Sequence, residues 1–319
     1  MTFNLTMIAP VIDAVFPIFA LILTGWLCAR FKLLSALSME GLNKFVIYLA
    51  LPSQLFYAMA HAKLTELAQP GFVLSFGISI FLTSGLQAFL SRNSKQNPID
   101  RMIDCMTSGY SNAGFMGIPL CLMIFGPASL GPSIISTLFT VSLLFAVTIA
   151  FIELQKNKDG QVFKTLLKIL LAMLRNPLLL APLLGMALSA SPWSLPTSAD
   201  RYFNLLGEAA TPCALISIGL FLAQSSHVSA DKGVLQIVAL KLLVQPIIAT
   251  ICVLYIFDMP KMWALVAILA SALPVGTGPF MMANLYRRDA SASARAILLS
   301  TILSVITISA LTAWVTLAM

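Results

Sequence analysis

Two apolar stretches decide the fold of this chain: SGYSNAGFMGIPLCLMIF (Ser108–Phe125) and ASALPVGTGPFMMANLY (Ala270–Tyr286). Both are interrupted by glycine and proline, and Pro119 and Pro279 within them lie 160 positions apart. The same offset relates Pro17 to Pro177, Gly25 to Gly185 and Pro52 to Pro212. The chain therefore reads as a duplication with one interrupted helix in each half. Paired interruptions of this kind are typical of secondary transporters, which bind substrate at the breaks.

The composition puts this chain in a lipid bilayer. Of its 319 residues 59% are hydrophobic and 10% charged, and the mean hydropathy is +0.94. A soluble globular protein is far less apolar, so a soluble enzyme is excluded. The length leaves room for about ten spans of roughly 20 residues. The five cysteines all lie in apolar runs without a metal-ligand or disulfide spacing, so we expect free thiols and no cofactor.

Hydropathy predicts ten helices, at residues 8–29, 41–60, 70–90, 101–125, 131–152, 176–190, 202–224, 234–256, 262–286 and 292–317. Fifteen of the 19 lysines and arginines then fall on one side of the membrane and three on the other. Positive charge gathers on the cytoplasmic side. We therefore expect both termini outside, and the net charge of +7 reflects topology rather than binding to nucleic acid.

The fold class predicted is an all-α polytopic membrane protein with ten transmembrane helices in two inverted five-helix repeats. Residues 1–159 form the first repeat and residues 160–319 the second, and an odd number of spans per repeat inverts the second relative to the first. Residues 163–174 carry lysines four positions apart among leucines. They read equally well as an amphipathic interfacial helix or as an inner extension of the sixth span.

The broken helices 4 and 9 predict a polar site within the membrane, because irregular backbone in hydrocarbon needs protein or water to satisfy it. Half-helix N-termini bring free N–H groups and partial positive charge, which favour an anion. Glycines and prolines would shape the breaks, while hydroxyl and amide groups would donate hydrogen bonds to a carboxylate. The predicted substrate site comprises Ser111, Asn112, Gly114, Gly117, Pro119, Pro274, Gly276, Thr277, Gly278 and Pro279. The alternative is that these residues merely kink the helices for packing.

These motifs resemble the auxin efflux carrier family. The first stretch is similar to its fourth span, and RNPLLLAPLLGMAL, ALISIGLFLA, KLLVQPIIA and the second stretch resemble later segments in order. The resemblance implies the ten-helix fold shared with bile acid symporters, with helices 4 and 9 crossing. Spans 1, 2, 6 and 7 would form a scaffold and spans 3–5 and 8–10 a mobile core. It also implies a bacterial inner-membrane carrier of malonate, malate or similar acids, and a possible homodimer.

Ionisable residues inside spans are functional hypotheses because they are costly in a membrane. Lys241 and Asp104 enter helices 8 and 4 from the same side, so they could pair and support the crossover or respond to a proton. Lys241 could equally snorkel to the interface. Gln54, beside Pro52, could line the scaffold wall of the site or join two helices by a hydrogen bond.

The sequence thus predicts a secondary active transporter of small organic anions, working by alternating access, with a proton or sodium ion as a possible coupling partner. It predicts no metal site and no catalysis, because His61 and His227 fall on opposite sides of the membrane and no Walker or zinc motif is present. Alternatives on the same fold are a sodium-coupled symporter or a sodium/proton antiporter. A channel and an intramembrane hydrolase using Lys241 are more remote alternatives.

Overall fold

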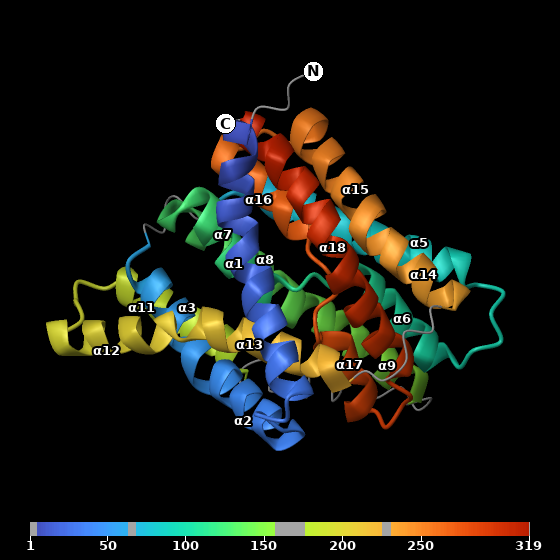
Figure 1. Ribbon diagram of the computed structural model, residues 1–319. Coiled ribbons are helices and arrows are strands. Elements are labelled where there is room, and N and C mark those ends of the chain that lie inside the picture. The colour runs from blue at the N-terminus through green and yellow to red at the C-terminus, as the bar shows by residue number, and fades with distance from the viewer. Residues whose placement is uncertain (1–4, 63–67, 157–175, 225–230, 319) are drawn as a thin grey trace.

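The computed structural model describes residues 5–62, 68–156, 176–224 and 231–318, drawn as ribbon in Figure 1. The regular structure of these residues is helical, and β-type pairing among them is limited to one isolated bridge. The all-α class predicted from hydropathy is confirmed. The segment 163–174, with its two open interpretations, lies outside the described residues, as does His227.

The described residues of the first half, 5–62 and 68–156, form five helical stretches. In order, they are α1 (Leu5–Arg30); α2 (Ala36–Phe45), η1 (Val46–Ala50) and α3 (Leu51–Ala60); α5 (Pro70–Leu90); α6 (Pro98–Gly109), η2 (Ala113–Gly117) and α7 (Ile118–Phe125); and η3 (Pro127–Ser129), α8 (Leu130–Leu138), η4 (Phe139–Leu144) and α9 (Phe145–Lys156).

The described residues of the second half, 176–224 and 231–318, are also largely helical. Its elements are α11 (Pro177–Ser189); α12 (Thr197–Glu208) and α13 (Ala210–Gln224); α14 (Lys232–Ala239), η5 (Leu240–Val244), α15 (Gln245–Ile251) and η6 (Cys252–Ile256); α16 (Lys261–Ala272) and α17 (Gly278–Leu285); and α18 (Ser291–Ala318). Each of the ten ranges expected from hydropathy is helical, with boundaries shifted by up to 5 residues.

Five of the described helices are long and apolar enough to cross a membrane: Pro70–Leu90, Pro127–Gln155, Thr197–Gln224, Lys232–Ile256 and Ser291–Trp314. Shorter apolar helices cover Val15–Arg30, Ala113–Phe125, Pro177–Ser189 and Lys261–Ala272. Two of these short helices are halves of broken ones, so length alone cannot count them as crossings. Ten crossings and the inverted repeat remain predictions.

Proline explains three wide, π-type turns inside the helices. The turns η1, η2 and η5 each end two residues before a proline, at Pro52, Pro119 and Pro246. A proline has no N–H and its ring excludes the carbonyl four residues earlier. The helix accommodates the proline with a wider turn, in which an N–H donates to the carbonyl five residues earlier. The Ile118 N–H, for example, donates to the Ala113 carbonyl.

The helices pack in two groups. In one, α1 lies against α13, and α3 lies against α11 and α12; in the other, α5, α6, α9, α14–α16 and α18 pack together. The start of α1 and the end of α18 lie close together at the top of Figure 1, where these helices of different groups touch.

Two glycines 160 positions apart have the same packing role. A Cβ at Gly25 of α1 would lie 2.1 Å from the Ile216 carbonyl oxygen of α13, and one at Gly185 of α11 would lie 2.5 Å from the Phe56 carbonyl oxygen of α3. Both helix pairs therefore cross closely enough to require glycine, which supports a duplicated architecture.

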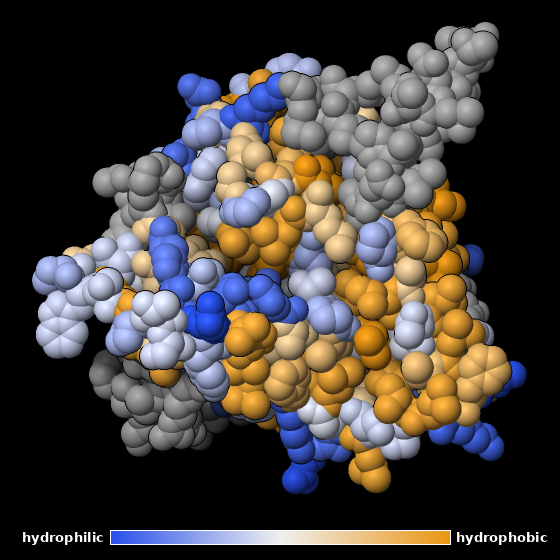
Figure 2. All heavy atoms as spheres, turned by 60° about the vertical axis from the view of Figure 1, so that its left-hand side comes forward, coloured by the Kyte–Doolittle hydropathy of each residue, from blue (hydrophilic) through white to orange (hydrophobic). Residues whose placement is uncertain are grey.

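The surface is strongly apolar in places. Figure 2 shows orange, apolar side chains spread over much of the right-hand part of one face. Large exposed hydrophobic side chains lie along α5, α15–η6 and α18, and they include Leu74, Leu82, Ile247, Leu254, Ile302 and Ile306. Contact with lipid chains removes such surface from water.

Candidate functional site

The two helix breaks lie side by side at the centre of the site. In the first half α6 ends at Gly109 and helix resumes at Ala113; in the second α16 ends at Ala272 and α17 begins at Gly278. The N–H of Asn112 donates to the Pro274 carbonyl at 2.9 Å, and the N–H of Gly276 donates to the Tyr110 carbonyl at 3.1 Å. These bonds form an antiparallel bridge between Ser111 and Val275. Each break thus supplies backbone partners that the other needs away from water.

The first break lies nearer the N-terminus than the glycine–proline pattern suggests. Gly114 and Gly117 belong to the turn η2, and Pro119 follows in α7, where the π-type turn before it accommodates the missing N–H. Helix restarts this early because the Asn112 carbonyl accepts the N–H groups of Met116 and Gly117. The break itself is Tyr110–Asn112.

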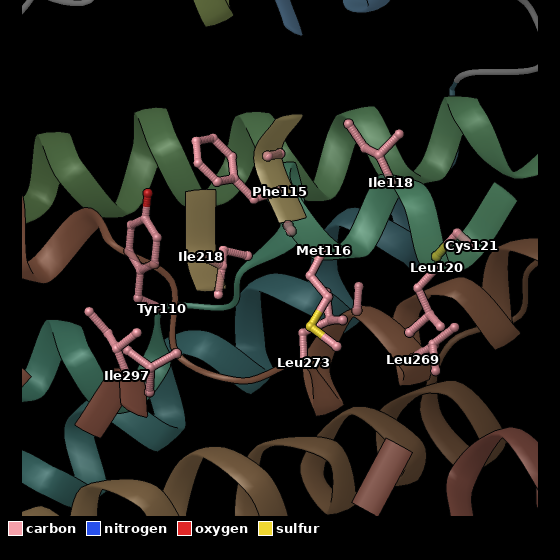
Figure 3. Close-up of a cluster of buried hydrophobic side chains, with 14 of the residues drawn as sticks. Tyr110, Phe115, Met116, Ile118, Leu120, Cys121, Ile218, Leu269, Leu273 and Ile297 are labelled. Carbon is pink, nitrogen blue, oxygen red and sulfur yellow. The ribbon is translucent and has the colours of Figure 1, made fainter. Parts of the chain in front are cut away.

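Gly117 serves close packing rather than unusual backbone angles. A Cβ there would lie 2.7 Å from the Leu273 side chain. Figure 3 shows the neighbouring Met116 pointing toward Leu273, and Leu120 lying beside Leu269. The start of the resumed helix in the first half is therefore packed on the last turns of α16.

The second break contains Pro274, Gly276 and Thr277, while Gly278 and Pro279 open α17. Its glycines make room for one aromatic ring from the first break. A Cβ at Gly276 would lie 2.8 Å from Tyr110 Cε1, and one at Gly278 would lie 2.2 Å from Tyr110 Cζ. The Tyr110 ring, buried at 6% exposure, thus lies across the second break.

One face of the α14–α15 helix supports the C-terminal ends of both broken helices. Lys241 Nζ donates to the Ser271 carbonyl near the end of α16 at 2.7 Å. Four residues later Gln245 Nε2 approaches the Gly109 carbonyl at the end of α6 at 3.5 Å. Both side chains are fully buried. Helix C-termini leave carbonyls without partners and carry partial negative charge, which a lysine complements.

Lys241 and Asp104 do not form the ion pair that was one sequence-based alternative. The Asp104 carboxylate accepts a hydrogen bond from Gln96 Nε2 at 3.3 Å, and no ion pair between described residues joins it to Lys241. The lysine amine reaches the end of α16, whereas the aspartate lies midway along α6 and bonds to Gln96 of the loop that precedes this helix. Nor does Lys241 snorkel to a surface, since its side chain is 0% exposed.

A cavity of about 290 Å³ opens beside the breaks. Its lining comprises Ile47, Tyr48, Leu51, Tyr110, Ser111, Asn112, Ala113, Gly114, Phe115, Thr137, Val141, Phe145, Asn176, Pro177, Leu178, Thr277, Gly278 and Met281. Both breaks, η1 and α3, η4 and the start of α11 therefore meet around one space. This size suits a small molecule, because drug-sized ligands need about 300–1,000 Å³.

The polar groups that line this cavity are neutral donors. Ser111 is 1% exposed and its Oγ has no hydrogen-bond partner, and Asn112 is 7% exposed. The N–H groups of Gly114, Phe115 and Gly278 have no acceptor among the described residues. They lie in the first turns of resumed helices, where partial positive charge favours an anion. This arrangement can bind a carboxylate without any cationic side chain.

The cavity contains some of the predicted site residues and not others. The residues that line it are Ser111, Asn112, Gly114, Thr277 and Gly278. The predicted residues that lie in or beside the breaks but do not line the cavity are Gly117, Pro119, Pro274, Gly276 and Pro279. Gln54 does not line the cavity. It packs on Gly207 of α12, where an added Cβ would lie 3.0 Å from Gln54 Cα.

The scaffold wall of the cavity was missed from sequence. Asn176 Oδ1 accepts the N–H of Leu178 at 3.0 Å and so caps α11, and Tyr48 comes from η1. The Asn-Pro pair at 176–177 is a recognisable helix start. Only the packing of α11 beside η1 and α3 brings it to the breaks.

A larger depression of about 690 Å³ lies elsewhere, between the end of α3 and the segment that joins α11 to α12. His61 and Asp200 lie in its wall, with Nε2 and Oδ1 3.1 Å apart. No break residue reaches it. Among the described residues, no three His, Cys, Asp or Glu side chains gather as metal ligands.

Several membrane-length helices and a cavity beside two paired breaks are features of the class of multi-pass membrane transporters. A family model described as "Membrane transport protein" matches residues 10–312, and the chain belongs to this family, that of the auxin efflux carriers.

Three relatives show the range of this family. The chain is 28% identical to "Putative malonate transporter" of Rhizobium meliloti over 95% of each chain. It is 24% identical to "Uncharacterized transporter YfdV" of Escherichia coli, covering 87% of this chain and 90% of the relative. It is 25% identical to "Auxin efflux carrier component 8" of Arabidopsis thaliana, covering 86% and 89%.

Proposed function

We propose that this protein is a secondary active transporter of small organic anions, carboxylates such as malonate or malate. The observation that carries the proposal is the cavity at the breaks, where unpaired N–H groups of Gly114, Phe115 and Gly278 lie beside the donors of Ser111, Asn112 and Thr277. Preorganised neutral donors hold a carboxylate without the desolvation cost of a buried cation.

The names of two relatives agree with this class of substrate. The Rhizobium meliloti protein is named for malonate and the Arabidopsis thaliana protein for auxin, which is also a carboxylate. The small cavity favours the smaller acid for this chain.

The transport mechanism we propose is alternating access. The group of α1, α2–α3, α11 and α12–α13 would be the scaffold, and the remaining helices the mobile core. The cavity has walls from both groups, so a movement of the core would carry a bound anion past the scaffold. Ten spans in two inverted repeats would place the breaks at mid-membrane.

The distribution of lysine and arginine supports an inner-membrane protein with both termini in the periplasm. A proton or sodium ion would drive accumulation. A homodimer through the scaffold is proposed on the family resemblance.

Counterflow in proteoliposomes tests this function. Vesicles preloaded with malonate, malate or succinate are diluted into labelled malonate, with and without sodium and proton gradients. A carrier accumulates label transiently and saturates, whereas a channel does neither. The gradient that raises accumulation identifies the coupling ion. Folded protein that accumulates no label with any of these acids would refute the carboxylate assignment.

A further inference from the structure

Two helix groups supply the polar side chains that line the cavity. The breaks supply Ser111, Asn112 and Thr277 with their neighbouring N–H groups. The other group supplies Asn176, at the start of α11, and Tyr48 of η1. Apolar side chains complete the lining, among them Ile47, Leu51, Val141, Phe145 and Leu178.

The side-chain Nδ2 of Asn176 carries hydrogen-bond donors that no described residue uses. Its Oδ1 is used to cap α11 through the Leu178 N–H, so the orientation of its amide is fixed. The two N–H groups on Nδ2 have no partner among the described residues. Because this side-chain amide is already held in place, it would lose little conformational entropy when its N–H groups bind a ligand in the cavity.

We propose that Asn176 is the specificity-determining residue for a second carboxylate, so that the cavity binds a short dicarboxylate from the breaks to the scaffold. One carboxylate accepts hydrogen bonds from the break residues, and the other accepts them from Asn176 Nδ2. This inference rests on the proposed function and adds to it the residue that would hold the second carboxylate of acids such as malonate.

Donors from both helix groups would also make the cavity select dicarboxylates over monocarboxylates. A monocarboxylate of the same length would leave the donors of Asn176 facing an apolar group after their water had been expelled. Sites built to hydrogen-bond a substrate group reject analogues that lack it. Contact with both helix groups would further make binding sensitive to movement of the core against the scaffold.

The test compares malonate with propionate, which keeps three carbons and has one carboxylate. Asn176→Ser and Asn176→Asp retain an oxygen that can cap α11 but remove the amide donors. Asn204→Leu, on α12 outside the cavity, is the control for an altered asparagine. For each protein, the KM for labelled malonate and the inhibition constant of propionate are measured in counterflow.

The expected result is selective. Asn176→Ser should raise the KM for malonate about tenfold or more, the effect of losing a hydrogen bond to a charged group. Asn176→Asp should raise it further through repulsion, and in both the inhibition constant of propionate should stay within about twofold. Asn204→Leu should match the wild type in both constants.

Two results would overturn the assignment of Asn176: equal weakening of malonate and propionate, or no change in either. Both leave wild-type malonate counterflow intact, so the proposed function would stand. Wild-type protein that moves neither acid would refute the proposed function and, with it, this inference.

Discussion

The Nζ atom of Lys241 lies 2.7 Å from the carbonyl oxygen of Ser271 and donates a hydrogen bond to it. This joins helix α14–α15 to the last turn of α16, the first half of a broken helix. Gln245, one turn further along, approaches the equivalent end of α6. Lys241 and Gln245, one turn apart on the same helix, thus contact the carbonyls at the C-terminal ends of both broken helices.

Replacing Lys241 should impair transport by releasing the end of α16. Lys241→Met keeps most of the apolar stem, is one atom shorter, and leaves the Ser271 carbonyl without its donor. We expect the counterflow rate to fall about tenfold, since a buried polar group left without its hydrogen-bond partner costs about 1–3 kcal/mol. Lys232→Met, at the exposed start of the same helix, is the control and should transport normally. Normal counterflow in Lys241→Met would show that the end of α16 needs no support.

Gln245 should matter in the same way but less, because its contact with Gly109 is longer. Gln245→Leu should lower counterflow several-fold, as a neutral hydrogen bond contributes about 0.5–1.5 kcal/mol. The variant Lys241→Met/Gln245→Leu should lose less than the product of the two single effects, since both residues hold one pair of crossing breaks. Strict multiplicativity in a double-mutant cycle would argue that the two supports act independently.

Asn112 is expected to contact the substrate directly. Asn112→Leu keeps the approximate volume and removes the amide, so the KM for malonate should rise at least about tenfold while the thermal midpoint in detergent changes little. The backbone N–H that bonds to Pro274 is unaffected by this change. An unaltered KM would remove Asn112 from the binding site.

Gly278 should tolerate no side chain while Tyr110 is present. Gly278→Ala sets a Cβ 2.2 Å from Tyr110 Cζ, and the resulting overpacking should lower the free energy of unfolding by about 1–3 kcal/mol. Tyr110→Leu in the same chain should recover part of that loss. Gly85→Ala in α5, where a Cβ meets nothing within 4 Å, should leave the thermal midpoint unchanged or raise it. Equal midpoints for Gly278→Ala and wild type would contradict this packing.

An ion pair joins the two halves at one end of the core. Arg288, in the loop before α18, donates from Nε to Asp100 Oδ1 at 2.6 Å and from a second nitrogen to Oδ2. The hydrogen bond to Asp100 raises the pKa of Arg288, so raising the pH toward 10 should not break the pair. Asp100→Asn should lower the thermal midpoint, and the exchange Asp100→Arg/Arg288→Asp should restore part of it. Failure of the exchange to exceed both single variants would show that the pair adds no stability.

Much of the fold follows from local properties of the chain. Hydropathy and length predict the helices because a buried or lipid-facing helix needs a continuous apolar run. Prolines at 52, 119 and 246 predict local irregularity because the ring acts on its own helix. Gly25 and Gly185 mark close helix contacts in both halves, although the partner helices cannot be read from spacing.

The site was only partly accessible from sequence. Ser111, Asn112, Gly114, Thr277 and Gly278 line the cavity and belong to the interrupted stretches themselves, while their binding of substrate stays a prediction. Asn176 and Tyr48 could not be assigned to it, because they reach the breaks through contacts between helices far apart in the chain. The same reason explains Lys241: a polar amine in an apolar run needs a hydrogen-bond acceptor, but the run does not show which buried group accepts that hydrogen bond.

By itself, then, the sequence determined an all-helical membrane chain and the two segments where its helices break, since these depend on hydropathy, on proline and on glycine; the duplication suggested by the spacing stays a prediction. Tertiary structure decided that Ser111 pairs with Val275, that Lys241 donates a hydrogen bond to Ser271 rather than to Asp104, and that Asn176 lines the same cavity as the breaks. Backbone groups without partners in an apolar interior must find them in space. Which partner is nearest depends on how the helices pack, and the sequence of a single segment does not determine that packing.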